Sequence, residues 1–277
     1  MARADDLFIE NCKEILENGY SSEGRKVRAH WEEDGSPAHT IKTFGVVNRY
    51  DLSKEFPIQT IRKINFKKAV DEILWIWQRK SNNVKDLDSH IWDAWADDSG
   101  SIGKAYGYQM SLKYQFPEGE FDQVDKVLYD LKHKPYSRRI LTNMYNFEDL
   151  KDMHLYPCAY SMTFNVTGNK LNAILNQRSQ DMLVANSWNV TQYAVLVHMF
   201  AQVSGLEAGE LVHVISDAHI YDKHVPIVKE LITRETYPAP QLWVDPEVKD
   251  FYDFTVDSFK LIDYQHGPTV RHIPVAV

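Results

Sequence analysis

The stretch LYPCAYSMTFNVTGNKLNAILNQRSQDMLVANSWN, residues 155–189, decides the fold. Pro157 fixes the backbone just before Cys158, and residues 160–166 after it read as a strand. The turn TGNK at 167–170 and the alternating apolar side chains of 171–176 then predict a return strand. The stretch therefore predicts a hairpin that presents the Cys158 thiol at the start of its first strand.

The return strand ends at Gln177-Arg178-Ser179, and a hairpin brings its two ends together. Arg178 is therefore expected close to Cys158. A thiol attacks only as the thiolate, and a nearby guanidinium lowers the thiol pKa. The planar guanidinium also matches phosphate oxygens, with the Ser179 hydroxyl as a further donor. These residues predict a nucleophilic thiol beside an anion site.

Asp181 follows, and Ser187-Trp188-Asn189 is expected to begin a helix. Its run 190–203 is apolar almost all round and is followed by Gly205, which is typical of a buried central helix with a glycine stop. Asn189 would then hold a polar amide at the edge of an apolar core. Such an amide is both donor and acceptor, and can read the edge of a nucleobase such as uracil.

The PC pair, the QRSxD loop, the asparagine helix, DAHIY at 217–221 and the terminal PVAV occur in the order seen in the thymidylate synthase family, which this chain resembles nearly from end to end. These motifs are similar to those of the shorter Bacillus and phage members of the family. The resemblance implies an α+β fold with a large, mostly antiparallel or mixed sheet flanked by helices, one sheet face packing against a partner in a homodimer.

The bulk composition limits the choices further. With 277 residues, 44% of them hydrophobic, and no linker or repeat, residues 1–277 are expected to form a single catalytic domain. A net charge of −8 argues against a nucleic-acid polymer as partner, so an anionic ligand needs a local arginine cluster. No apolar stretch is long enough for a membrane and no signal-peptide core is visible. Two cysteines provide neither a disulfide framework nor a metal site, and a cytoplasmic location is expected.

The first half of the chain predicts regular elements from its periodicity. Apolar residues over 8–16 indicate an amphipathic helix that ends at Gly19 and keeps Cys12 in the core. Residues 40–52 alternate as in a strand, and 66–77 form a helix with one apolar face. Glu72 lies at the flank of that face, where a carboxyl has a raised pKa. The pattern alone makes Glu72 an ordinary flank glutamate. The resemblance of EILW to the family motif instead implies a glutamate that orders water around uracil O4.

Aromatic residues follow in two clusters, at 91–95 and around Tyr106. By themselves such residues usually fill a core or an interface. The resemblance of IWDAW and of the glycine-flanked Tyr106 to family motifs implies that Trp92 and Trp95 wall the folate ring and that Tyr106 helps remove the C5 proton through water. It also implies folate contacts at Asn65, where many members have histidine, and at Ala276, in a terminal lid whose alternative is a frayed or docked end.

Three further arginines are candidates for phosphate binding. Arg138 and Arg139 are expected to open a strand, pointing to opposite faces, and are otherwise exposed sheet-edge charges. The resemblance implies that both cross a homodimer interface to the phosphate in the other subunit's site. In the loop 24–39 the family's usual arginine is missing, and Arg28 either reaches in instead or is a solvated loop residue.

Residues 211–221 are predicted to form a buried strand, with His219 and Tyr221 on one side. A histidine paired with Cys158 could indicate a thiol hydrolase. The resemblance instead assigns His219 and Tyr221 to the deoxyribose hydroxyl, and the QRSxD loop, with Gln180 and Asp181, to nucleotide and folate. Residues 238–252 are expected to be surface turns before a strand over 254–261.

The resemblance implies reductive methylation of dUMP to dTMP, in which Cys158 adds to uracil C6 and methylenetetrahydrofolate, without a metal, gives carbon and hydride and leaves as dihydrofolate. Two alternatives stay open. Ala159, Ala185, Ser187 and Trp188 replace the usual histidine, glycine, proline and phenylalanine, so a dUMP hydroxymethylase that releases tetrahydrofolate is one. A dCMP substrate is disfavoured, because cytosine-specific relatives carry aspartate in place of Asn189. The second open alternative is a catalytically silent nucleotide-binding dimer.

Overall fold

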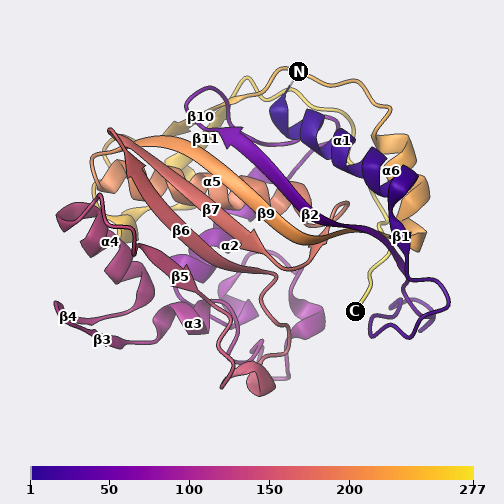
Figure 1. Ribbon diagram of the computed structural model, residues 1–277, viewed down its shortest axis with the longest axis horizontal. Helices are drawn as coiled ribbons and strands as arrows, with labels where there is room; N and C mark the ends of the chain where they lie inside the picture. The colour runs from indigo at the N-terminus through magenta and orange to yellow at the C-terminus, as the bar shows by residue number, and fades with distance from the viewer. Residues whose placement is uncertain (1) are drawn as a thin grey trace.

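The computed structural model describes residues 2–277, and its centre is the long strand β9. A seven-stranded sheet has the order β1-β2-β9-β7-β6-β5, with the short β8 also paired to β9. β9 runs antiparallel to β2 but parallel to β7 and β8, so the sheet is mixed. The strands, of which all but β8 are labelled in Figure 1, are β1 Tyr20–Ser21, β2 Thr40–Asp51, β5 Leu141–Asn143, β6 Ala159–Thr167, β7 Lys170–Gln177, β8 Gln180–Asp181 and β9 Glu207–Tyr221.

The predicted hairpin is confirmed as β6 and β7. Thr167 pairs with Lys170 across a two-residue turn, in which Gly168 has a φ of +63° that favours glycine. The register shifts between Ala159 and Ser161, so a β-bulge lies immediately after Cys158. The hairpin thus returns its last residues to the place where its first strand begins.

The helices cover one face of the sheet, with α2 and α5 behind the strands in Figure 1 and α1 beside β2. α5 is buried on nearly every side, as its continuous apolar sequence predicts, and begins one residue before the expected start. The helices are α1 Arg3–Asn18, α2 Phe66–Trp77, α3 Gly107–Ser111, α4 Gln123–His133, α5 Asn186–Val203 and α6 Val225–Leu231. No helix within residues 2–277 is both long and apolar enough to cross a membrane.

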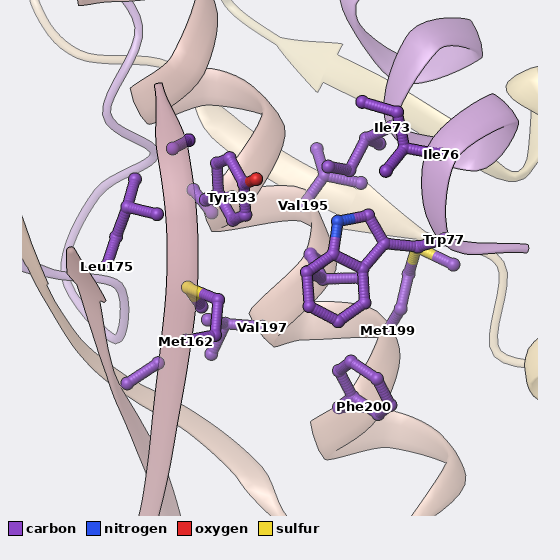
Figure 2. Packing of buried hydrophobic residues seen from close by; sticks show 14 of the residues in the cluster. Ile73, Ile76, Trp77, Met162, Leu175, Tyr193, Val195, Val197, Met199 and Phe200 are labelled. Carbon is purple, nitrogen blue, oxygen red and sulfur yellow. The ribbon is translucent and has the colours of Figure 1, made fainter. Parts of the chain in front are cut away.

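Large aromatic side chains fill the space between α2, α5 and the sheet. Trp77 of α2 lies edge-on to Phe200 of α5, with ring centroids 6.2 Å apart, and Phe200 stacks on Phe251 at 4.7 Å. Figure 2 shows Trp77 beside the α5 residues, with Met162 and Leu175 of the sheet on the far side. Removing this apolar surface from water is the main force that fixes α5 against the sheet.

The opposite face of the sheet carries exposed apolar side chains. The strand registers place Val47, Ile174 and Leu141 on this face, and they are 55%, 40% and 55% exposed. Exposed apolar side chains gathered on one sheet face are typical of a protein–protein contact.

Two sequence predictions are wrong in their boundaries. Arg138 and Arg139 do not open a strand: they precede β5 in a turn where the Ser137 hydroxyl accepts the Arg139 N–H at 3.2 Å. Residues 254–261 are not one strand, because Thr255 and Ser258 form a capping box around a 3₁₀ turn and only β11 follows. Residues 238–252, expected to be surface turns, contain the partner strand of β11. This pair is β10 Gln241–Val244 and β11 Phe259–Ile262, and a second small hairpin is β3 Tyr114–Phe116 and β4 Gly119–Phe121.

Candidate active site

Cys158 lies at the start of β6, and the hairpin brings Arg178 to it as predicted. The Arg178 Nη2 atom is 3.7 Å from the Cys158 Sγ, and the Arg178 backbone N–H donates to the Cys158 carbonyl at 3.0 Å. The guanidinium also donates to the carbonyls of Pro157 and Tyr156, at 2.9 and 2.7 Å. These bonds fix the guanidinium in a single orientation beside the thiol.

The electrostatics of the thiol differ from the sequence expectation. Burial raises the pKa of Cys158, and although the charges of Arg178 and Arg28 and a hydrogen bond with Tyr106 all lower it, burial is the largest effect. Arg178 therefore acts in the expected direction without producing a net lowering. The guanidinium also donates to the two backbone carbonyls, and burial of Cys158 favours the neutral thiol.

Tyr106 and two tryptophans form the wall next to this thiol. The Tyr106 hydroxyl accepts the Cys158 N–H at 3.1 Å, and its ring packs on Trp92 at 4.9 Å. Trp92 in turn contacts Trp95 at 5.9 Å. The backbone of Tyr106 has a φ of +46°, which is strained for any residue other than glycine. The packing around Tyr106 holds the backbone in this conformation. The structure thus brings the predicted aromatic residues together at Cys158.

Glu72 is buried in α2, deeper than the flank position expected from periodicity, and is 3% exposed. The Trp188 indole Nε1 donates to its Oε2 at 3.1 Å. Burial raises the pKa of Glu72 to about 7, against the opposing effect of the Gln192, Trp188 and Trp92 side chains. The predicted raised pKa is confirmed, and at neutral pH the carboxyl exists in both protonation states.

The Asn189 side chain, in the first turn of α5, is held by a row of amides. Its Oδ1 accepts from Gln177 Nε2 at 3.0 Å, and its Nδ2 donates to Gln192 Oε1 at 3.2 Å. His213 in turn donates through Nε2 to the Gln177 Oε1 at 2.8 Å. Burial lowers the pKa of His213 to about 3, so the imidazole is neutral. Sequence reasoning missed Gln177, Gln192 and His213, whose only signal was a polar side chain at a buried position.

Asp181 lies in β8, directly beside His219 of β9. Its Oδ1 accepts the backbone N–H groups of Leu183 and Val184, and its Oδ2 lies 3.7 Å from the His224 Nδ1. Burial alone would raise the pKa of Asp181, but His224 and these donors lower it, so the carboxylate is charged. His224 also donates to the Pro274 carbonyl at 2.8 Å and so links Asp181 to the C-terminal segment.

His219 and Tyr221 share one side of β9 as predicted, with ring centroids 5.2 Å apart. The His219 Nδ1 is 2.9 Å from the Asp217 carboxylate, which leaves Nε2 for another partner. Burial and the charge of Asp181 raise the pKa of Tyr221 to about 12, against the lowering effect of Arg28. Its hydroxyl is therefore neutral at neutral pH and can donate a hydrogen bond.

The remaining predicted residues lie around this centre. Arg28 is exposed, yet its charge reaches Cys158 and Tyr221. Within residues 2–277, no hydrogen bond or ion pair joins the exposed Arg138 or Arg139 guanidinium to Cys158.

Three further predicted residues have local contacts. Asn65 caps α2 by accepting the Lys68 N–H at 3.3 Å. Ala276 pairs with Trp31, so the terminus is docked. Ser179 and the buried Gln180 continue from Arg178 toward Asp181, and the Gln180 Nε2 lies 3.4 Å from the Asn189 Oδ1.

Known proteins match this chain over nearly its whole length. The family model described as thymidylate synthase matches residues 6–277. Thymidylate synthase from Bacillus mojavensis is 47% identical over 96% of this chain and 97% of that protein, and the one from Bacillus phage phi3T is 46% identical over the same shares. The solved thermostable thymidylate synthase A from Bacillus subtilis has a TM-score of 0.93 at 45% identity and covers 99% of each chain.

The match of sequence and of mixed α+β fold to these proteins over nearly the whole chain defines an enzyme of the methyltransferase class. The chain belongs to the thymidylate synthase family.

Proposed function

We propose that this chain catalyses the reductive methylation of dUMP to dTMP, with methylenetetrahydrofolate as the donor of the carbon and the hydride and dihydrofolate as the second product. The observation that carries the proposal is the Cys158 Sγ with the Arg178 Nη2 3.7 Å away, in a chain of this family. Residues 1–277 then act as one catalytic domain.

The reaction begins with covalent addition. The Cys158 thiolate, favoured by Arg178, adds to C6 of the uracil ring and turns C5 into an enolate nucleophile. C5 attacks the methylene carbon of the folate, and loss of the C5 proton then expels the folate nitrogen from that carbon and leaves an exocyclic methylene. A hydride passes from the released tetrahydrofolate to this methylene, which gives the methyl group and dihydrofolate. Loss of the thiolate from C6 restores the ring double bond. Covalent addition is needed because C5 of an unmodified uracil is too weak a nucleophile for this transfer.

The charge and the proton are handled by groups on three elements. Asn189 reads N3–H and O4 of the base, and its amide row keeps it in one orientation. Glu72, with a pKa of about 7, orders water at O4 and exchanges protons with it. The neutral Tyr106 hydroxyl, fixed against the Cys158 backbone, assists removal of the C5 proton through water.

The nucleotide's phosphate is bound by Arg28, Arg178 and Ser179, together with Arg138 and Arg139 donated across a homodimer interface. The exposed apolar side chains of the sheet face and the exposure of both Arg138 and Arg139 support this arrangement. Several guanidiniums are needed to hold a dianion on a chain of net charge −8. His219 and Tyr221 bind the deoxyribose hydroxyl, and Gln180 and Asp181 complete the nucleotide site.

The reduced folate packs on Trp92 and Trp95, and the charged Asp181 accepts a hydrogen bond from its ring. Asn65 and Ala276 lie at the outer side of this site. No metal takes part in the proposed steps. We place the enzyme in the cytoplasm, because Cys12 and Cys158 are free thiols and the reaction needs Cys158 reduced.

The experiment that tests the function is identification of both products from dUMP and methylenetetrahydrofolate. Methylation yields dTMP and dihydrofolate, whereas hydroxymethylation yields a hydroxymethyl nucleotide and tetrahydrofolate. We expect dTMP and dihydrofolate in equal amounts. Tetrahydrofolate as the product would overturn methylation in favour of the hydroxymethylase, and absence of turnover would favour a silent nucleotide-binding protein.

A mixed-dimer experiment tests the shared site. Arg139→Ala and Cys158→Ala homodimers are each expected to be nearly inactive, because every site lacks one group. After the two variants are unfolded and refolded together, random pairing gives mixed dimers with one complete site, and about one quarter of the wild-type activity should return. The control mixes Cys158→Ala with the Arg139→Ala/Cys158→Ala double variant. No pairing of these two chains contains Cys158, so no complete site can form. If no activity returns from the first mixture, Arg139 is not donated across the interface.

A further inference from the structure

The Trp188 side chain makes a polar contact that its apolar packing against the core does not require. Trp188 is the third residue of α5 and is half-buried against the core. Its indole Nε1 donates to Glu72 Oε2 at 3.1 Å. Phenylalanine could fill much of the same apolar space, but it carries no donor. The N–H is thus a feature of this chain that acts directly on a buried carboxyl.

Among the residues that the structure describes, 2–277, Trp188 makes the side-chain hydrogen bond to the Glu72 carboxyl, and the other neighbours act on it differently. The Asp71 carboxylate on the same helix is turned to Arg79, at 2.8 Å, and accepts the Asp88 N–H at 2.9 Å. Gln192 and Trp92 also lower the pKa of Glu72, Gln192 more strongly than Trp188, and Tyr193 is close enough for Glu72 to raise its pKa. The neighbours that act on the Glu72 carboxyl most strongly are therefore neutral donors and one like charge.

We propose that Trp188 is a positioning residue for Glu72: its indole N–H fixes one carboxylate oxygen and favours the ionised form of the group, an inference that rests on the proposed role of Glu72 in dUMP methylation. An indole can only donate, and its hydrogen bond is stronger to the charged carboxylate than to the acceptor oxygen that the neutral acid keeps. Trp188 thereby joins the first turn of α5, which also carries Asn189, to the carboxyl that orders water at the same base.

The direction of the effect follows from the acceptor. A hydrogen bond to the charged form lowers a carboxyl pKa, so removing the donor raises the pKa of Glu72 above its present value of about 7. One bond to a charged group corresponds to a shift on the order of one pH unit. At neutral pH a smaller fraction of Glu72 is then ionised, and the limb of the pH profile that depends on it moves to higher pH.

Trp188→Phe tests this, since it keeps an aromatic ring in the same place and removes the indole donor. The first measurement is the pH dependence of kcat and of kcat/KM for dTMP formation. The second is the carboxyl titration by infrared difference spectroscopy, with Glu72→Gln to identify the band. We expect both to shift upward by about one pH unit. Trp243→Phe, on β10 and outside the site, is the matched control and should leave both unchanged.

The outcomes separate the two proposals. An unshifted Glu72 titration in a folded Trp188→Phe protein overturns the role of Trp188, whether or not dTMP is formed. If the wild type forms no dTMP but the carboxyl titration still shifts, the proposed function fails while the action of Trp188 on Glu72 stands. A loss of activity with no change in either pH dependence would mean that Trp188 acts only through packing, and would also overturn the proposal.

Discussion

Replacement of Cys158 by serine is expected to lower the rate of dTMP formation by at least about a thousandfold, as for other enzymes that lose their nucleophile. The serine hydroxyl has nearly the same size but is far harder to ionise, and the Arg178 guanidinium 3.7 Å from the sulfur cannot make up the difference. The measurement is the spectrophotometric release of dihydrofolate under saturating dUMP and folate.

The second cysteine supplies the matched control. Cys12 is fully buried in α1, where burial raises its thiol pKa, so Cys12→Ala should keep its catalytic rate provided it folds. Mass spectrometry of the denatured protein should detect a covalent nucleotide adduct in the wild type and in Cys12→Ala, but none in Cys158→Ser. A Cys158→Ser enzyme with near wild-type turnover would exclude the proposed chemistry.

The second large effect concerns stability. Phe200→Ala is expected to reduce the free energy of unfolding by about 3–5 kcal/mol. Phe200 is 0% exposed and packs on three rings, those of Phe251 at 4.7 Å, Phe164 at 5.2 Å and Trp77 at 6.2 Å, so truncation leaves a cavity among groups that are themselves fixed. Denaturant unfolding at one fixed protein concentration measures the change, because assembly would otherwise contribute.

A truncation at the surface serves as the comparison. Ile262→Ala removes an apolar side chain of β11 that is 44% exposed, and should cost under about 1 kcal/mol. Equal losses for Ile262→Ala and Phe200→Ala would mean that the cluster around α5 is not a packed core.

The sequence predicts those parts of the fold that depend on local periodicity. The hairpin of β6 and β7 follows from alternation around a glycine turn, and α5 from its uninterrupted apolar run. The prediction of one strand over residues 254–261 failed, because the pattern of their apolar residues is also compatible with a 3₁₀ turn. The capping contact between Thr255 and Ser258 stabilises that turn. The order of the strands depends on contacts between distant segments, and periodicity carries no information about it.

The site divides in a similar way. The proximity of Arg178 to Cys158 follows from hairpin geometry alone, and the resemblance to a known family points to Tyr106, Glu72 and Asn189. The net effect on the Cys158 pKa could not be predicted, because it is a balance between burial and charge. The support of Asn189 by Gln177 and His213 was equally invisible, since both belong to strands read only as core.

The place of β9 in the sheet also bears on how the protein is made. β9 lies between β2 and β7, and its pairing residues begin about 160 positions after β2 ends, at Glu210 against Asp51. A ribosome therefore releases β2 long before its neighbour exists, and contacts so distant along the chain close slowly. Until residue 207 has emerged, the nascent chain must carry β2 and β7 as open strand edges, the state in which β proteins are most prone to aggregate and most in need of chaperones.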